Sequence, residues 1–122
     1  MGAVEKRREN QFFKETVNGM KNLGIYKKEF DALIRRYAEI RTQFKALNEQ
    51  WTNEGCIITE EYTNKSGETH ERKTALYSVI EKMRTELTEI ENLLGLTPKG
   101  LQAIKKKGLE QPKKSALDKL LG

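Results

Sequence analysis

Residues 30–51 read FDALIRRYAEIRTQFKALNEQW. The large apolar side chains of this stretch recur at alternating steps of three and four, which places them on one stripe of a helix. The stripe consists of Phe30, Leu33, Tyr37, Ile40, Phe44, Leu47 and Trp51. Neither proline nor glycine interrupts the chain between Lys27 and Gly55, so about 28 residues can form one helix about 42 Å long. Such a helix needs a partner to cover its stripe.

A second stripe with the same spacing follows within residues 74–94. It consists of Leu76, Ile80, Met83, Leu87, Ile90 and Leu94. Two stripes of matching period in one small chain predict an antiparallel helical hairpin. The glutamates beside the second stripe are numerous enough to suggest a metal site, but no histidine or aspartate accompanies them in this helix. We therefore interpret them as the polar faces of the helix and expect no metal or other cofactor.

Between the two stripes the pattern changes. Residues 57–63 are rich in β-branched side chains, and residues 64–67 have the composition of a turn. This predicts a short β-hairpin or an extended loop at the tip of the helical pair, over residues 55–73. The return arm after the turn, residues 68–73, is very polar, so an extended loop remains the alternative to a second strand. The lone His70 in this segment has no second histidine or nucleophile nearby in sequence, which favours a solvated loop residue.

Shorter elements flank the hairpin. Residues 4–22 predict a helix with apolar side chains on one face, which ends before Gly24 as at a glycine C-cap. Gly95 ends the second stripe helix, Thr97 is the expected N-cap of the next helix, and Pro98 stands at its first position. That short helix ends in three consecutive lysines, which suit both a helix C-terminus and phosphates.

The predicted fold is therefore mainly α. It is a long antiparallel helical hairpin with an N-terminal helix, a β-hairpin or extended loop at the tip, and a short C-terminal helix plus a flexible tail. We divide the chain into an N-terminal helix (1–24), a helical-hairpin core for oligomerisation (25–94), a short basic helix (95–107) and a flexible basic tail (108–122). The length of 122 residues allows one modest hydrophobic core.

Composition narrows the class of protein. The single cysteine, Cys56, rules out an intramolecular disulfide and a multi-cysteine metal site, and agrees with a reducing compartment. No apolar run approaches the roughly 20 residues that span a bilayer, and the first residues do not resemble a signal peptide. We expect a soluble cytoplasmic protein without membrane contact. No glycine-rich phosphate loop, acidic metal constellation or nucleophile–base set is present in the sequence, so we expect no enzyme.

Positive charge is concentrated at the two ends of the chain. Residues 95–122 hold seven basic and two acidic side chains, whereas residues 55–94 hold five basic and eight acidic ones. A polyanion bound near the termini would explain this, and so would the ordinary solubility of exposed helix faces and tails. If the polyanion is DNA, the candidate contacts are Lys6, Arg7, Arg8, Lys14, Lys99, Lys105, Lys106 and Lys107. Both ends remain candidates.

The apolar surface predicts a closed homo-oligomer. Phe44 and Trp51 have too little cover within a two-helix hairpin, and a strand-like tip offers free edges to neighbouring copies. The candidate interface side chains are Phe30, Leu33, Tyr37, Phe44, Trp51, Ile57 and Tyr62.

Two stretches resemble the phage terminase small subunit family, in the group found with cohesive-end, long-tailed phages. One is YKKEFDALIRRYAEIRTQFKAL at residues 26–47, and the more specific one is the LGLTP junction at residues 94–98 before a short basic helix. The resemblance covers roughly residues 12–107. Many members follow the proline with small residues and an arginine, whereas Lys99-Gly100-Leu101 stands here.

The resemblance implies a DNA-packaging protein that works in the cytoplasm of the host cell. Its partners would be viral double-stranded DNA, further copies of itself in a ring, and the large terminase subunit with its ATPase and nuclease. A leucine-bearing tail can dock as a short helix in a groove, so Leu117, Leu120 and Leu121 are the candidate contacts with the large subunit. The alternative is a non-enzymatic coiled-coil protein that binds only protein partners.

Overall fold

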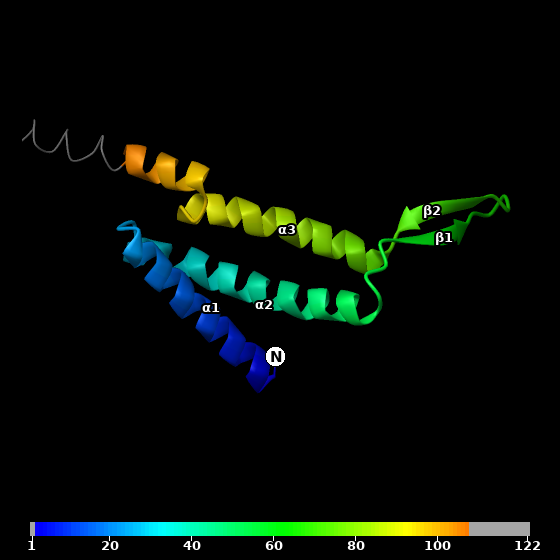
Figure 1. The fold of residues 1–122 in the computed structure, drawn as a ribbon, viewed down its shortest axis with the longest axis horizontal. Helices are drawn as coiled ribbons and strands as arrows, with labels where there is room; N and C mark the ends of the chain where they lie inside the picture. Colours follow the sequence, from blue (N-terminus) through cyan, green and yellow to red (C-terminus); the bar gives the residue numbers. More distant parts are fainter. Residues whose placement is uncertain (1, 108–122) are drawn as a thin grey trace, which may run out of the picture.

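A computed structural model describes residues 2–107 of the chain. The elements are α1 (Ala3–Asn22), a 3-10 turn (Lys28–Phe30), α2 (Asp31–Asn53), β1 (Thr59–Thr63), β2 (Thr69–Lys73) and α3 (Ala75–Leu94). Residues 98–107 form a further helix (Figure 1). The described part is mainly helical, with a β-hairpin at the tip and a short C-terminal helix, and the predicted fold class is confirmed. The predicted tail at 108–122 lies outside the described residues.

The predicted helical hairpin is formed by α2 and α3, which lie side by side and antiparallel (Figure 1). The Tyr37 hydroxyl of α2 donates a hydrogen bond of 2.7 Å to Glu91 of α3. Nearer the tip, the rings of Trp51 and Tyr77 lie with centroids 5.6 Å apart. Every member of the second stripe is buried or half-buried, as its spacing predicts.

The other side of α2 is covered by α1. The guanidinium of Arg35 lies 4.1 Å from the centroid of the Phe13 ring, and that of Arg41 lies 4.1 Å from the Phe12 ring. Because α2 is packed on two sides, its most buried side chains are not those of the stripe alone: they are Ile34, Tyr37, Ala38 and Thr42. The buried Thr42 hydroxyl donates to the Ala38 carbonyl at 2.8 Å, so no unpaired hydroxyl is left in this contact.

The long helix begins later than its sequence predicts. Lys27 is extended, with φ −138° and ψ 148°, and the single 3-10 turn that follows leads into α2 at Asp31 instead of near Lys27. The Tyr26 hydroxyl donates to Asp31 at 2.6 Å. This bond ties the connecting loop to the first turn of α2 and replaces the helical turn that the periodicity suggested.

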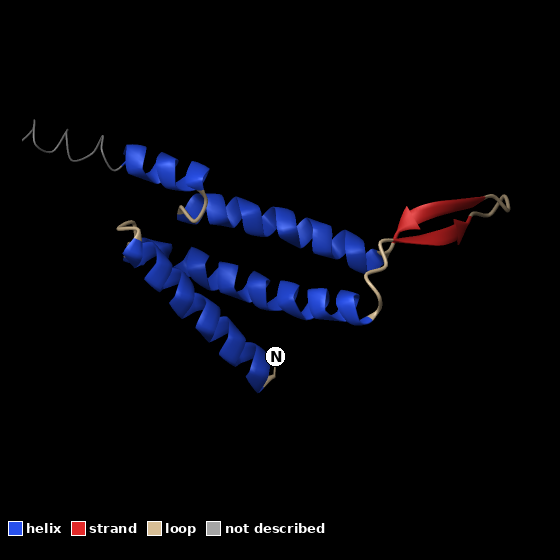
Figure 2. Ribbon diagram, in the orientation of Figure 1, coloured by secondary structure: helices blue, strands red, loops and turns tan. Residues whose placement is uncertain are grey.

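The segment between α2 and α3 is a β-hairpin, drawn in red in Figure 2. β1 and β2 are antiparallel, with Thr59 opposite Lys73 and Thr63 opposite Thr69. The side-chain oxygen of Asn64 accepts from the backbone N–H groups of Ser66 and Glu68, which closes the turn. The polar return arm is thus a strand, and all strand residues are exposed.

The hydrophobic core lies at the end of the molecule opposite the hairpin, where α1, α2 and α3 come together (Figure 1). Its buried members are Met20, Ile25, Ile34, Tyr37, Leu87, Ile90 and Leu94. The main apolar cluster therefore lies near residues 34–37 and 87–94. Nearer the tip, Ile80 of α3 is also fully buried, whereas Trp51 and Tyr77 are half-buried.

Candidate nucleic-acid and assembly surfaces

The junction before the C-terminal basic helix has the geometry that its sequence predicts. Gly95 is left-handed, with φ +75°, and the N–H of Leu96 reaches back to the Glu91 carbonyl at 2.9 Å. The Thr97 hydroxyl accepts from the N–H of Gly100 at 3.0 Å, as an N-cap does, and donates to the side chain of Asn92. These bonds close the end of α3 and start the next helix at residue 98.

Gly100 allows this helix to pack tightly on the end of α3. A Cβ atom built at Gly100 would lie 2.1 Å from the carbonyl oxygen of Asn92, which is backbone and has no rotamer to change. Leu101 and Ile104 turn their side chains to the core, whereas Lys99, Lys105, Lys106 and Lys107 are exposed. Within residues 2–107, the predicted C-terminal lysines are thus accessible to an anion.

Ile25 brings the loop between α1 and α2 to the same end. A Cβ atom at Gly95 would lie 2.7 Å from both Ile25 and Ile104, so these two side chains meet over the α3 C-terminus. Lys27 and Lys28 of this loop are exposed. Neither lysine was among the predicted DNA contacts, because the meeting of the loop with the C-terminal helix is a tertiary contact that sequence spacing does not reveal.

The basic residues predicted on the first helix differ in their surroundings. Lys6, Arg7 and Lys14 are exposed. Arg8 instead lies 3.6 Å from Glu49 of α2 and is half-buried. Its charge is therefore partly balanced within the chain.

The residues predicted for the oligomer interface lie in three settings. Phe30 and Leu33 are half-buried against the core. Tyr37 is only 3% exposed, so very little of its ring is left for a neighbouring copy. Burial raises the pKa of Tyr37, and its hydrogen bond to Glu91 raises it further.

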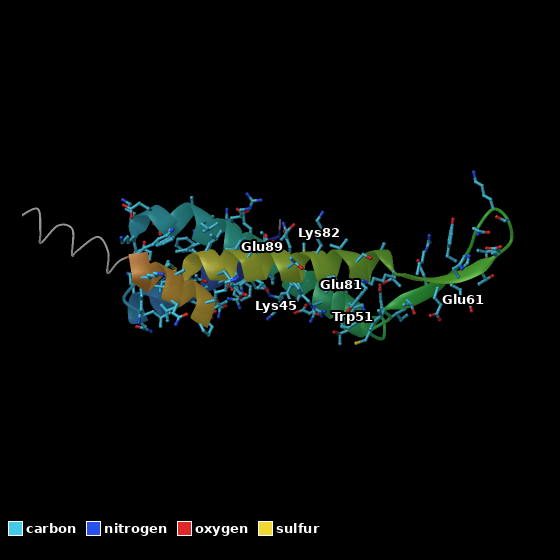
Figure 3. The ribbon with its side chains drawn as sticks, turned by 90° about the horizontal axis from the view of Figure 1, so that it is seen from above. Lys45, Trp51, Glu61, Glu81, Lys82 and Glu89 are labelled. Atoms are coloured by element: carbon cyan, nitrogen blue, oxygen red, sulfur yellow. The ribbon has the colours of Figure 1, made fainter. Side chains whose placement is uncertain are left out.

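Phe44 and Trp51 are only half-covered by their own chain. Phe44 lines a groove between the helices together with Phe12, Tyr37, Arg41 and Leu87. Trp51 lies where the body meets the hairpin (Figure 3), and its indole N–H donates to the Ile57 carbonyl at 2.9 Å. A neighbour could still cover part of both rings.

Ile57 and Tyr62 are exposed on the hairpin, at 51% and 41%. The Tyr62 ring carries the guanidinium of Arg72 at 4.2 Å, and Arg72 also lies 3.2 Å from Glu60. His70 is exposed and lies 3.3 Å from Glu68. The hairpin thus presents a mixed surface of charges and apolar side chains.

Neither a metal-binding cluster nor a membrane-spanning helix is found in the described part of the chain. Among residues 2–107, no group of three or more His, Cys, Asp or Glu side chains is arranged to hold a metal ion. No helix within that range is both long and apolar enough to span a bilayer.

The class that these features define is a small helical protein with exposed lysines at one end, half-covered aromatic rings on α2 and a projecting β-hairpin. The family model described as "Phage terminase, small subunit" matches residues 10–111. The chain therefore belongs to the phage terminase small subunit family and takes part in the packaging of phage DNA, which confirms the resemblance. No curated protein and no solved structure matches the chain.

Proposed function

We propose that this chain assembles into a ring, binds the packaging start on viral double-stranded DNA, and regulates the large terminase subunit that carries the ATPase and nuclease. The observation that carries this proposal is the family match over residues 10–111. Packaging takes place in the host cytoplasm, where viral DNA and the large subunit are both present.

DNA binding is supported by the basic end of the molecule. Lysines of the α1–α2 loop and of the C-terminal helix are exposed there: Lys27, Lys28, Lys99, Lys105, Lys106 and Lys107. They come from two segments that Ile25 and Ile104 hold together. Because each lysine that neutralises a phosphate releases a counterion, such a surface binds DNA with a steep salt dependence.

Ring formation is supported by the half-covered side chains of Phe44 and Trp51 and by the β-hairpin. Phe44 and Trp51 keep part of their surface uncovered, and both hairpin strands have a free edge. Exposed strand edges of this kind pair readily with another chain. The apolar side chains of Ile57, Ile58 and Tyr62 would be removed from water in such a contact.

Oligomer state and DNA binding can be tested together. Native mass spectrometry with and without a duplex that carries the viral packaging start should reveal a closed oligomer that binds the duplex. A species of 14.1 kDa at micromolar concentration would refute the ring. Binding that is absent, or that does not weaken as salt is raised, would instead favour the alternative of an adaptor that binds only proteins.

The two parts of the C-terminal region can be separated by variants. Replacing Lys105, Lys106 and Lys107 by glutamine should reduce the slope of log affinity against log salt by about one for each phosphate that is no longer neutralised. Removing residues 108–122 should leave the fold and the ring intact and abolish stimulation of the large subunit's ATPase. A truncation after Lys107 that keeps both DNA binding and stimulation would remove any role for the tail, including Leu117, Leu120 and Leu121.

A further inference from the structure

The side of α1 that faces away from α2 carries one continuous polar stripe. Its members follow one another at steps of four, three, four and three residues, so they lie along one line of the helix. All five are exposed: Arg7, Gln11, Lys14, Asn18 and Lys21. We call this set the outer stripe. It holds three positive charges, two carboxamides and no carboxylate.

The acidic residues of α1 are sorted away from the outer stripe. Glu9 is almost fully buried on the opposite side of the helix, 3.5 Å from Arg35 of α2. Glu5 is half-buried. Glu15 lies at the border and accepts a hydrogen bond of 3.1 Å from Gln11, an exposed pair four residues apart that is easily exchanged for another partner. The field of the outer stripe is therefore positive and suits an anionic partner.

The contacts of α1 hold this stripe on a rigid support. Met20 and Thr16 are buried toward α2, and the rings of Phe12 and Phe13 are covered by guanidinium groups of α2. α3 lies on the other side of α2, so α1 is an outer helix of the body (Figure 1). Its exposed side can therefore approach a partner without displacing any described element.

We propose that the outer stripe of α1 enters the major groove of double-stranded DNA and reads base edges through Gln11 and Asn18. A carboxamide can donate to and accept from adenine at the same time, which is how glutamine and asparagine distinguish that base. Lysine or arginine can contact guanine in the same way or bind phosphates.

The dimensions agree with this docking. An α-helix with its side chains is about 10–12 Å across, which fits the major-groove width of about 12 Å, and Gln11 and Asn18 lie about 10 Å apart along the helix axis. Arg7 and Lys21 lie one turn beyond the two carboxamides, about 21 Å apart along the helix, where they can reach the phosphates that border the groove. Lys14 lies midway. The stripe thus has base-reading side chains at its centre and phosphate-binding ones at its ends.

This inference rests on the proposed DNA binding, and it names the surface that supplies sequence preference. The C-terminal helix has one exposed carboxamide, Gln102, between Lys99 and Lys106, where the outer stripe has two. In this division of roles, the C-terminal lysines bind phosphates. Loss of affinity and loss of preference are therefore expected from different variants, which makes the two roles separable.

The test uses a library of double-stranded DNA with a randomised central segment of about 20 base pairs. The full-length wild-type protein is expected to enrich a sequence motif from it. The variant Gln11→Ala with Asn18→Ala should bind the unselected library as tightly as wild type, with the same salt slope, and lose the preference for the motif by about tenfold or more. Alanine favours helix at exposed positions, so the variant should fold, which circular dichroism checks.

A matched control replaces one glutamine and one asparagine elsewhere. Gln43 and Asn53 are exposed on α2, and their change to alanine should leave both motif and affinity unaltered. Replacing Arg7, Lys14 and Lys21 by glutamine should weaken binding to every duplex and reduce the salt slope by up to about three.

Three outcomes would count against the inference. Wild type that binds the library with a steep salt dependence but enriches no motif would overturn base reading and leave the proposed DNA binding in place. A Gln11→Ala, Asn18→Ala variant that enriches the same motif as strongly as wild type would overturn the assignment of these residues. Wild type that binds no duplex at all would refute the proposed DNA binding itself and the outer stripe with it.

Discussion

The two ends of the body are built on opposite principles. At the basic end, segments far apart in sequence bury apolar side chains against one another, and even a backbone carbonyl approaches Gly100 too closely for any other residue. At the hairpin end every strand residue is exposed, and the interactions of the strands are local, such as those of Arg72 with Glu60 and with the Tyr62 ring. The apolar contacts at the basic end therefore supply most of the stability of the three helices, whereas the hairpin contributes little to it.

The hairpin also contains an arrangement that does not favour its own folding. Glu61 and Glu71 are paired directly across the two strands, and like charges in that position destabilise a sheet. Figure 3 shows Glu61 well out on the hairpin, beyond Trp51. A surface that is exposed, partly apolar and carries two facing glutamates is what contact with a neighbouring chain would improve, in agreement with the proposed ring.

The largest effect should come from a cavity in the core. Ile34 is 0% exposed, and Ile34→Ala should lower the free energy of unfolding by about 2–5 kcal/mol. The matched change in the other region is Ile58→Ala, at a residue 45% exposed, which should cost about 0.5 kcal/mol or less in the isolated chain. Urea denaturation of both variants measures the difference, and equal losses would contradict the contrast between the two ends.

A smaller effect is expected where the C-terminal helix meets α3. Gly100→Ala would place a Cβ atom against the Asn92 carbonyl, so the helix must shift away, at a cost of about 1–3 kcal/mol. Hydrogen exchange should become faster over residues 98–107. Lys99→Ala, at the exposed neighbouring position, is the control and should leave exchange unchanged; if both variants behave alike, the close packing at Gly100 is not important for docking.

The half-covered rings of Phe44 and Trp51 provide the next test. Fully buried aromatic residues lose about 3–5 kcal/mol on change to alanine, but Phe44 and Trp51 are only half-buried in one chain, so we expect about 1–2 kcal/mol under conditions where the protein is dissociated. In the assembled form the loss should rise toward the full value. Denaturation at several protein concentrations measures this, and a cost that does not change with concentration would argue against a neighbour over either ring.

The smallest effect concerns pH. The raised pKa of Tyr37 means that the folded state keeps a proton that the unfolded chain releases above its ordinary pKa of about 10. Stability should therefore be complete below pH 10 and fall as the pH rises above it. Tyr37→Phe removes this contribution and leaves Glu91 without its hydrogen-bond donor, at a cost of about 1 kcal/mol near neutral pH.

The alkaline loss should be smaller in Tyr37→Phe than in wild type. It should not vanish, because the hydrogen bond to Asp31 raises the pKa of Tyr26 and contact with Glu81 raises that of Lys73, which act in the same direction. Tyr62→Phe, at an exposed hairpin residue, is the control. Denaturation at pH 8 and at about pH 11 gives the comparison, and identical pH profiles of wild type and Tyr37→Phe would contradict the assignment.

Local and periodic features of the sequence determined much of this fold. The regular spacing of large apolar residues identified α2 and α3 and their antiparallel pairing, because a helix must bury such a stripe. The junction at residues 94–98 and the turn at residues 64–67 could also be predicted from the sequence, because capping and turn residues form hydrogen bonds with backbone groups that are close to them in the chain. Residues 26–47 and the junction at residues 94–98 carried the family resemblance, which the match over residues 10–111 confirms.

Tertiary structure alone decided the remainder. The contact of α1 with α2 uses small buried residues such as Thr16 and Ala38, which contribute nothing to a pattern of large apolar side chains. It also sorts the charges: Glu9 and Arg8 turn to partners on α2, whereas the outer stripe is left facing solvent. The meeting of Ile25 with Ile104 gathers lysines from two segments at one end. Such choices depend on contacts between residues far apart in the chain, and local spacing does not encode which distant surfaces will meet.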